Sequence, residues 1–123
     1  MNIEAALTEA MNIDGALGAC LVDRESGMSL GAIGGGQYLD LDVASAGNTE
    51  VVRAKVRTMQ ALRLDDTIED ILITLSKQYH LIRLLTDSRS EQGLFLYLVL
   101  DRQRANLALA RHSLKWIGSE IAI

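Results

Sequence analysis

Two unbroken hydrophobic runs organise the chain. The longer run, 94–100 (LFLYLVL), lies between Gly93 and Asp101 and is rich in aromatic and branched residues. Its length and composition predict a β-strand, and because apolar and polar residues do not alternate in it, both of its faces should be covered. The run 16–22 has the same character. We therefore expect these two strands to lie side by side in the centre of a sheet.

Three segments space their apolar residues with the period of an amphipathic helix. They are residues 3–11, 42–64 and 104–121. An acidic residue at the start of the long segment, Asp40 or Asp42, can cap or charge its first turn, and Asn106 suits the N-cap of the last segment. The sequence thus predicts one short and two long helices.

Weaker patterns predict three further strands, at 28–33, 68–75 and 79–86, and a polar loop at 87–92. Ser29 and Gly31 leave one face of their strand nearly bare, which suits a sheet edge or a surface that a helix approaches closely. Consecutive strands favour antiparallel pairing, and the two continuous strands belong in the centre. The prediction is an α+β fold with a single antiparallel five-stranded sheet, in the order 2-1-5-4-3, flanked by helices on both faces.

The segment 42–64 carries two neighbouring stripes. The large-residue stripe, which can fill a groove on the sheet, comprises Leu41, Val52, Val56 and Met59. The small-residue stripe, which lets another backbone approach closely, comprises Ala44, Gly47, Val51, Ala54, Thr58 and Ala61. The strand 68–75 carries Ile71, Ile73 and Leu75 on one face and lies at the edge of the predicted sheet, where an apolar strand needs a partner. Both features predict a dimer whose interface contains the small-residue stripe and these three strand residues.

Composition narrows the classes of function. The 123 residues contain no linker or repeat and predict one domain, 1–123. A net charge of −4 argues against nucleic-acid binding. No apolar run approaches the length of a membrane span, about 18 residues. The single cysteine, Cys20, fits a reducing cytoplasm. Hydrophobic residues make up 49% of the chain but aromatic residues only 4%. This indicates either aliphatic surface hidden against another subunit or an Ala- and Leu-rich core.

No residues form a catalytic, cofactor-binding or metal-binding set. Cys20 falls within a predicted buried strand, where a thiol lacks the access that a nucleophile needs. His80 and His112 have no second His or Cys at metal-ligand spacing, and we interpret both as surface or interface residues. The glycines 34–36 could suggest a phosphate loop, but no Gly-Lys-Ser/Thr follows and Asp40 places an acid there. A strand-to-helix connection is therefore favoured.

Four basic residues cluster at the junction of the last strand and the last helix: Arg102, Arg104, Arg111 and Lys115. In an acidic chain they form either a solvated face or a docking surface for an acidic partner.

Taken together, the chain resembles the roadblock (dynein light-chain) family, prokaryotic type. The resemblance rests on residues 15–23 running into 26–28, on the small-residue helix 44–61, and on 94–102 followed by 105–111. It implies a roadblock/profilin-like order, α-β-β-α-β-β-β-α, and a homodimer or heterodimer in which edge strands join into one sheet and the middle helices pack together. It also implies a role in binding or regulating small Ras-like GTPases or in scaffolding larger complexes, and it supplies no catalytic residue.

We therefore expect a cytoplasmic, non-enzymatic, homodimeric regulatory or scaffolding module that partners or regulates a small Ras-like GTPase, without cofactor, nucleic acid or membrane insertion. The alternative is a sensory module of similar sheet-and-helix architecture that binds a small ligand, although no convergent polar groups mark its cavity.

Overall fold

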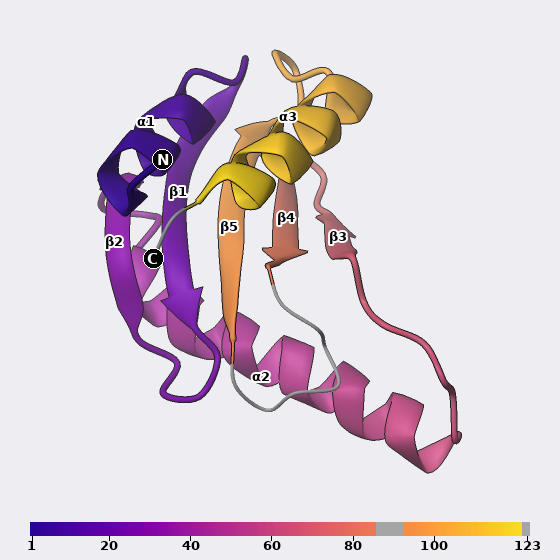
Figure 1. The fold of residues 1–123 in the computed structure, drawn as a ribbon. Helices are drawn as coiled ribbons and strands as arrows, with labels where there is room; N and C mark the ends of the chain where they lie inside the picture. The colour runs from indigo at the N-terminus through magenta and orange to yellow at the C-terminus, as the bar shows by residue number, and fades with distance from the viewer. Residues whose placement is uncertain (86–92, 122–123) are drawn as a thin grey trace.

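A five-stranded antiparallel sheet, ordered β2-β1-β5-β4-β3, separates two layers of core in the computed structural model, which describes residues 1–85 and 93–121. Helices α1 and α3 cover one face of this sheet and α2 crosses the other (Figure 1). The elements along the chain are α1 (Ile3–Met11), β1 (Ala16–Asp23), β2 (Ser29–Gly34), α2 (Leu41–Ala61), β3 (Asp70–Thr74), β4 (Gln78–Leu84), β5 (Leu94–Asp101) and α3 (Leu107–Glu120). The predicted fold class and strand order are confirmed.

The two continuous hydrophobic runs form the central pair of strands, as predicted. Strands β1 and β5 are antiparallel, with Cys20 opposite Tyr97 and Leu21 opposite Leu96. The side chains from Phe95 to Leu100 are all buried. Both faces of this pair are covered because successive side chains point alternately toward the α1–α3 layer and toward α2.

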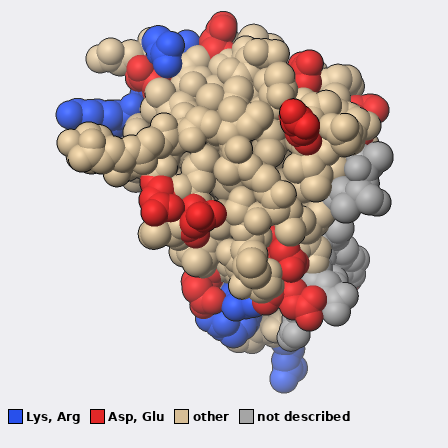
Figure 2. All heavy atoms as spheres, turned by 90° about the vertical axis from the view of Figure 1, so that its left-hand side faces the viewer, with Lys and Arg blue, Asp and Glu red and all other residues tan. Residues whose placement is uncertain are grey.

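Helix α1 lies close against β2 because that strand offers no side chain at the contact. A Cβ added at Gly31 would lie 3.1 Å from the side chains of both Ile3 and Leu7. The nearly bare face that the sequence indicated is thus the surface a helix approaches. The remaining surface of the β2 side exposes Met28 and Leu30, and Figure 2 shows a broad area there without charged side chains, bordered by acidic residues.

Helix α2 does not meet the sheet through the predicted large-residue stripe alone. Its buried residues are Leu41, Ser45, Thr49 and Val52, while Val56 and Met59 are only half-buried. The two hydroxyls can be buried because each bonds to the preceding turn of its own helix: Ser45 Oγ donates to the Leu41 carbonyl at 2.6 Å and Thr49 Oγ1 to the Ser45 carbonyl at 2.8 Å. The stripe facing the sheet is therefore more polar than predicted.

The remaining differences concern where elements begin and end. Helix α2 ends at Ala61 rather than 64, because Arg63 adopts a left-handed conformation with φ of 56°. Helix α3 begins at Leu107 rather than 104, because the side chain of Asn106 caps it by accepting from the Leu109 amide. Strand β3 covers only 70–74, and the predicted loop 87–92 lies outside the described residues. The cap of α2 is Asp40, which accepts from two backbone amides.

Candidate functional site: an open sheet edge beside helix α2

One face of the sheet is only partly covered. Helix α2 packs against β1 and β2, shares a core layer with β5, and extends past the strands at its C-terminal end (Figure 1). Beyond it, the side chains of Ile71, Ile73 and His80 on β3 and β4 are only half-buried. Strand β3 pairs with β4 on one side, and no strand among the described residues pairs with its other side. An unpaired strand edge presents backbone donors and acceptors that another strand can bind.

The residues predicted for a dimer interface lie around this open half of the sheet. On α2, Ala44 is half-buried and the other members of the small-residue stripe are exposed. A Cβ added at Gly47 would meet no atom within 4 Å, so this flank of the helix is accessible. On β3, Ile71 packs against the same core layer as α2, and alternation places Ile73 on that face too. Leu75 follows the end of the strand and is 41% exposed.

Exposed apolar side chains that the sequence analysis did not single out add to this surface. Leu62 and Leu64, directly after α2, are 62% and 52% exposed, and Val43 near its start is 69% exposed. The sequence predicted a helix as far as residue 64 and so assigned both leucines to it; their position beyond its end follows only from the end of α2 at Ala61. That these residues, the small-residue stripe and the β3 residues contact a second copy remains a prediction.

A polar network lies at a shallow hollow of about 460 Å³ between α2, the segment 37–40 and strands β4 and β5. The hydroxyl of Tyr97 lies 2.8 Å from His80 Nδ1, and His80 Nε2 lies 2.8 Å from Gln78 Oε1. Because an amide oxygen only accepts, this arrangement is satisfied when Nε2 carries the proton and Nδ1 accepts from Tyr97. The side chain of Asn48 lines the same hollow. His80 is thus half-buried within a network rather than a simple surface residue.

Burial sets the protonation behaviour of this region. It lowers the pKa of His80 and raises the pKa of Tyr97. Burial also raises the pKa of the Cys20 thiol, which lies 3.4 Å from Ser45 Oγ in the core. A buried thiol with a raised pKa is unreactive, so the interpretation of Cys20 as a core residue is confirmed. Among residues 1–85 and 93–121 no group of three or more His, Cys, Asp or Glu side chains could hold a metal ion.

The glycines 34–36 connect β2 to α2 and use their amides within the protein. The amide of Gly35 donates to the Leu17 carbonyl and that of Gly36 to the Leu39 carbonyl. A Cβ at Gly34, where φ is 80°, would lie 2.7 Å from the Leu17 carbonyl oxygen, so this position requires glycine. The segment is the predicted strand-to-helix connection.

Three of the four clustered basic residues bind partners within the chain. Arg102 donates to the Leu75 carbonyl at 2.7 Å, and its guanidinium lies 5.0 Å from the centre of the Tyr79 ring. Arg104 pairs with Asp101 at 3.3 Å. Arg111 forms two bonds to the Asp70 carboxylate, at 2.9 and 2.8 Å.

Lys115, the fourth of these residues, is exposed on α3. The docking role of all four therefore stays a prediction, and Arg111 has a structural role in tying α3 to β3.

No helix in the described part of the chain is long and apolar enough to cross a membrane. Comparison with protein-family models and with curated protein sequences gave no match.

Comparison with solved structures gave clear matches. MglB of Myxococcus xanthus has 17% identity and a TM-score of 0.80, over 96% of this chain and 89% of that one. An MglB with a tetrameric arrangement has 18% identity and a TM-score of 0.80, over 95% and 82% of the two chains. A roadblock/LC7 domain from Streptomyces avermitilis has 11% identity and a TM-score of 0.77, over 96% and 92%. The chain therefore has the fold of the roadblock/LC7 domain, as the resemblance of its sequence predicted.

Proposed function

We propose that this protein is a non-enzymatic regulatory or scaffolding module that acts as a homodimer and partners or regulates a small Ras-like GTPase in the cytoplasm. The observation that carries the proposal is the unpaired edge of β3 beside the accessible small-residue stripe of α2, on the same side of the sheet. A surface that combines an open strand edge with an accessible helix flank suits a two-fold contact with a second copy.

The charge on β3 supports pairing with a second β3. Asp70 is the only charged residue of that strand, and Arg111 binds its carboxylate with two hydrogen bonds. Proteins commonly protect an open strand edge by placing uncompensated charges on it. In β3 that protection is absent, because the single carboxylate is neutralised from within the chain.

The first test is the oligomeric state. Light scattering at micromolar concentration should give about twice the monomer mass of 13.4 kDa, and Ala54→Glu should reduce it to the monomer because it places charges on the contact between the two α2 helices. Ala108→Glu, at an exposed position of α3 on the other face of the sheet, is the matched control and should remain dimeric. A monomeric unmodified protein would refute the dimer, and a dimeric Ala54 variant would show that another face forms it.

The GTPase role rests on the family resemblance and needs its own assay. A purified small Ras-like GTPase from the same organism is followed for nucleotide release and for GTP hydrolysis, with and without this protein. Faster hydrolysis indicates an activator, faster release an exchange factor, and binding without either effect a docking platform. Absence of binding in both nucleotide states would contradict this part of the proposal.

The alternative function, a sensory module for a small ligand, is favoured by the hollow that contains Asn48, His80 and Tyr97. These side chains supply the convergent polar groups that the sequence did not reveal. A library of small polar metabolites, screened by melting temperature, tests it. A reproducible increase that Tyr97→Phe abolishes would support the sensory function, and a screen without any increase would exclude it for the compounds used.

A further inference from the structure

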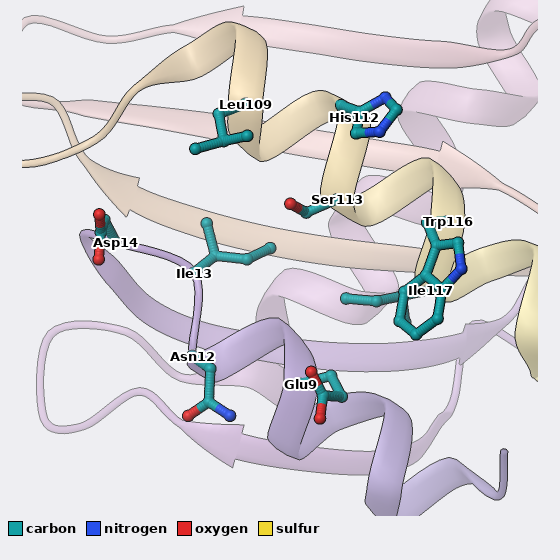
Figure 3. Close-up of a pocket in the computed structure, with 9 residues that line it drawn as sticks. All are labelled: Glu9, Asn12, Ile13, Asp14, Leu109, His112, Ser113, Trp116 and Ile117. Carbon is teal, nitrogen blue, oxygen red and sulfur yellow. The ribbon is translucent and has the colours of Figure 1, made fainter.

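A groove of about 460 Å³ lies between α1 and α3, on the face of the sheet opposite to α2 (Figure 3). Helix α3 contributes the apolar side chains of Leu109, Trp116 and Ile117 to its lining. The α1 side contributes Glu9, Ile13 and Asp14. The proposed dimer surface does not include these residues. The groove can therefore be occupied and tested independently of the proposed function.

The α3 wall of the groove exposes large apolar side chains. Leu109 is 56% and Trp116 50% exposed, and Trp116 is the only tryptophan of the chain. Seven residues apart, the two lie on the same side of α3, two turns from each other. Half-exposed tryptophan and leucine beside a groove are the kind of residues that dominate binding energy in protein interfaces.

The α1 wall is negatively charged. Glu9 lies in the last turn of α1, which contains no basic side chain, and Asp14 follows shortly after. Both carboxylates are exposed and line the groove. The C-terminal end of a helix carries partial negative charge, which adds to these carboxylates instead of balancing them. The lysine and the arginine of α3 do not offset them: Arg111 binds Asp70 at the far side of the helix, and Lys115 shares that side by helical periodicity. His112 is the one α3 side chain lining the groove that can carry positive charge.

We propose that this groove docks an amphipathic helix of a partner protein, with an apolar face at positions i, i+3 or i+4 and i+7 and with Lys or Arg along one border. The apolar face would cover Leu109 and Trp116, while the basic residues would face Glu9 and Asp14. An ammonium or guanidinium group could also stack on the Trp116 indole. A helix fits better than an extended peptide because both walls are helices and offer no strand edge to pair with.

Trp116 provides a direct assay, because its fluorescence reports on the groove alone. Three synthetic helical peptides serve as probes. One has a leucine face bordered by lysines, the second has glutamates in place of the lysines, and the third has the composition of the first with its leucines spread around the helix. The first peptide should shift the Trp116 emission to shorter wavelength in a saturable titration. The other two should bind at least about tenfold more weakly, since each loses either the charge complement or the apolar face.

Variants of the protein locate the binding. Glu9→Gln should weaken the lysine peptide about threefold, as expected for a solvent-exposed charge pair, and Leu109→Ser about tenfold. Glu4→Gln, on the same helix but outside the groove, and Leu30→Ser, at similar exposure outside both the groove and the proposed dimer surface, should leave affinity unchanged. Equal binding of the three peptides, or equal losses in Glu4→Gln and Glu9→Gln, would overturn the proposal. A drop in oligomer mass caused by Leu109→Ser without peptide would overturn it as well, by assigning the groove to a second copy.

Discussion

Replacement of Tyr97 by phenylalanine isolates the contribution of the polar network on the open half of the sheet. Tyr97 is only 2% exposed, and its ring meets that of His80 edge to face, with centroids 5.5 Å apart. Phenylalanine preserves this packing and removes the hydroxyl alone. The hydrogen bond between the hydroxyl and His80 Nδ1, at 2.8 Å, is lost.

The expected cost follows from this hydrogen bond. A hydrogen bond contributes about 1 kcal/mol net to stability, and a buried partner left unsatisfied costs more. Because His80 is only half-buried and borders the hollow, water can replace part of what it loses. We therefore expect Tyr97→Phe to lower the free energy of unfolding by about 1–2 kcal/mol, which corresponds to a melting temperature about 3–6 °C lower for each kcal/mol.

Urea denaturation followed by circular dichroism measures this loss, with Tyr38→Phe as control. Tyr38 is 95% exposed, so its hydroxyl bonds to water in both states and its removal should change stability by less than about 0.5 kcal/mol. A double-mutant cycle with His80→Gln should show coupling between the two side chains. If Tyr97→Phe were as stable as Tyr38→Phe, the network would not stabilise the fold and the reasoning would be wrong.

Three further predictions concern stability. Burial lowers the pKa of His80 from 6.5, so below pH 6.5 the unfolded chain binds a proton at this histidine more readily than the folded chain does. The free energy of unfolding should therefore decrease on acidification. Denaturation curves of His80→Gln at several pH values should lack this part of the pH dependence. Ser45→Ala should change the free energy of unfolding by less than about 0.5 kcal/mol, because its hydroxyl only adds a bond to a carbonyl of its own helix. Val52→Ala should lower the free energy of unfolding by about 1–3 kcal/mol. Equal losses of the two variants in thermal melts would contradict this. A double-mutant cycle of Asp70→Asn with Arg111→Gln should give a coupling of only about 0.5–1 kcal/mol, since Arg111 is 47% exposed, and zero coupling would exclude a stabilising role.

The framework of the fold was predictable because it depends on local patterns. Two continuous apolar runs can be buried on both faces only in the centre of the sheet, and this places β1 beside β5. Asn106 and Asp40 cap their helices through their own side chains. Such features follow from residues close together in the sequence.

The polar contacts could not be predicted because they depend on register and packing. His80 lies opposite Val99, and Tyr97 opposite Ile82, so the two polar side chains are diagonal neighbours. A shift of one residue would send His80 to the other face. Likewise the Arg111–Asp70 pair joins residues 41 positions apart, and it exists only because α3 crosses toward β3. From the sequence, Arg111 could be assigned only to a cluster of basic residues. Its carboxylate partner, Asp70, could be identified only from the tertiary structure.

Strand β2 forms the second edge of the sheet. A contact between two β3 strands related by two-fold symmetry closes on itself, because each copy has only one β3 to contribute. The joined sheet would still terminate in β2 at both ends, uncharged and with Met28 and Leu30 exposed nearby. Such a dimer is a building block with two identical ends. Whether it grows into longer assemblies then depends on β2, and the face that forms the dimer has no influence on that growth.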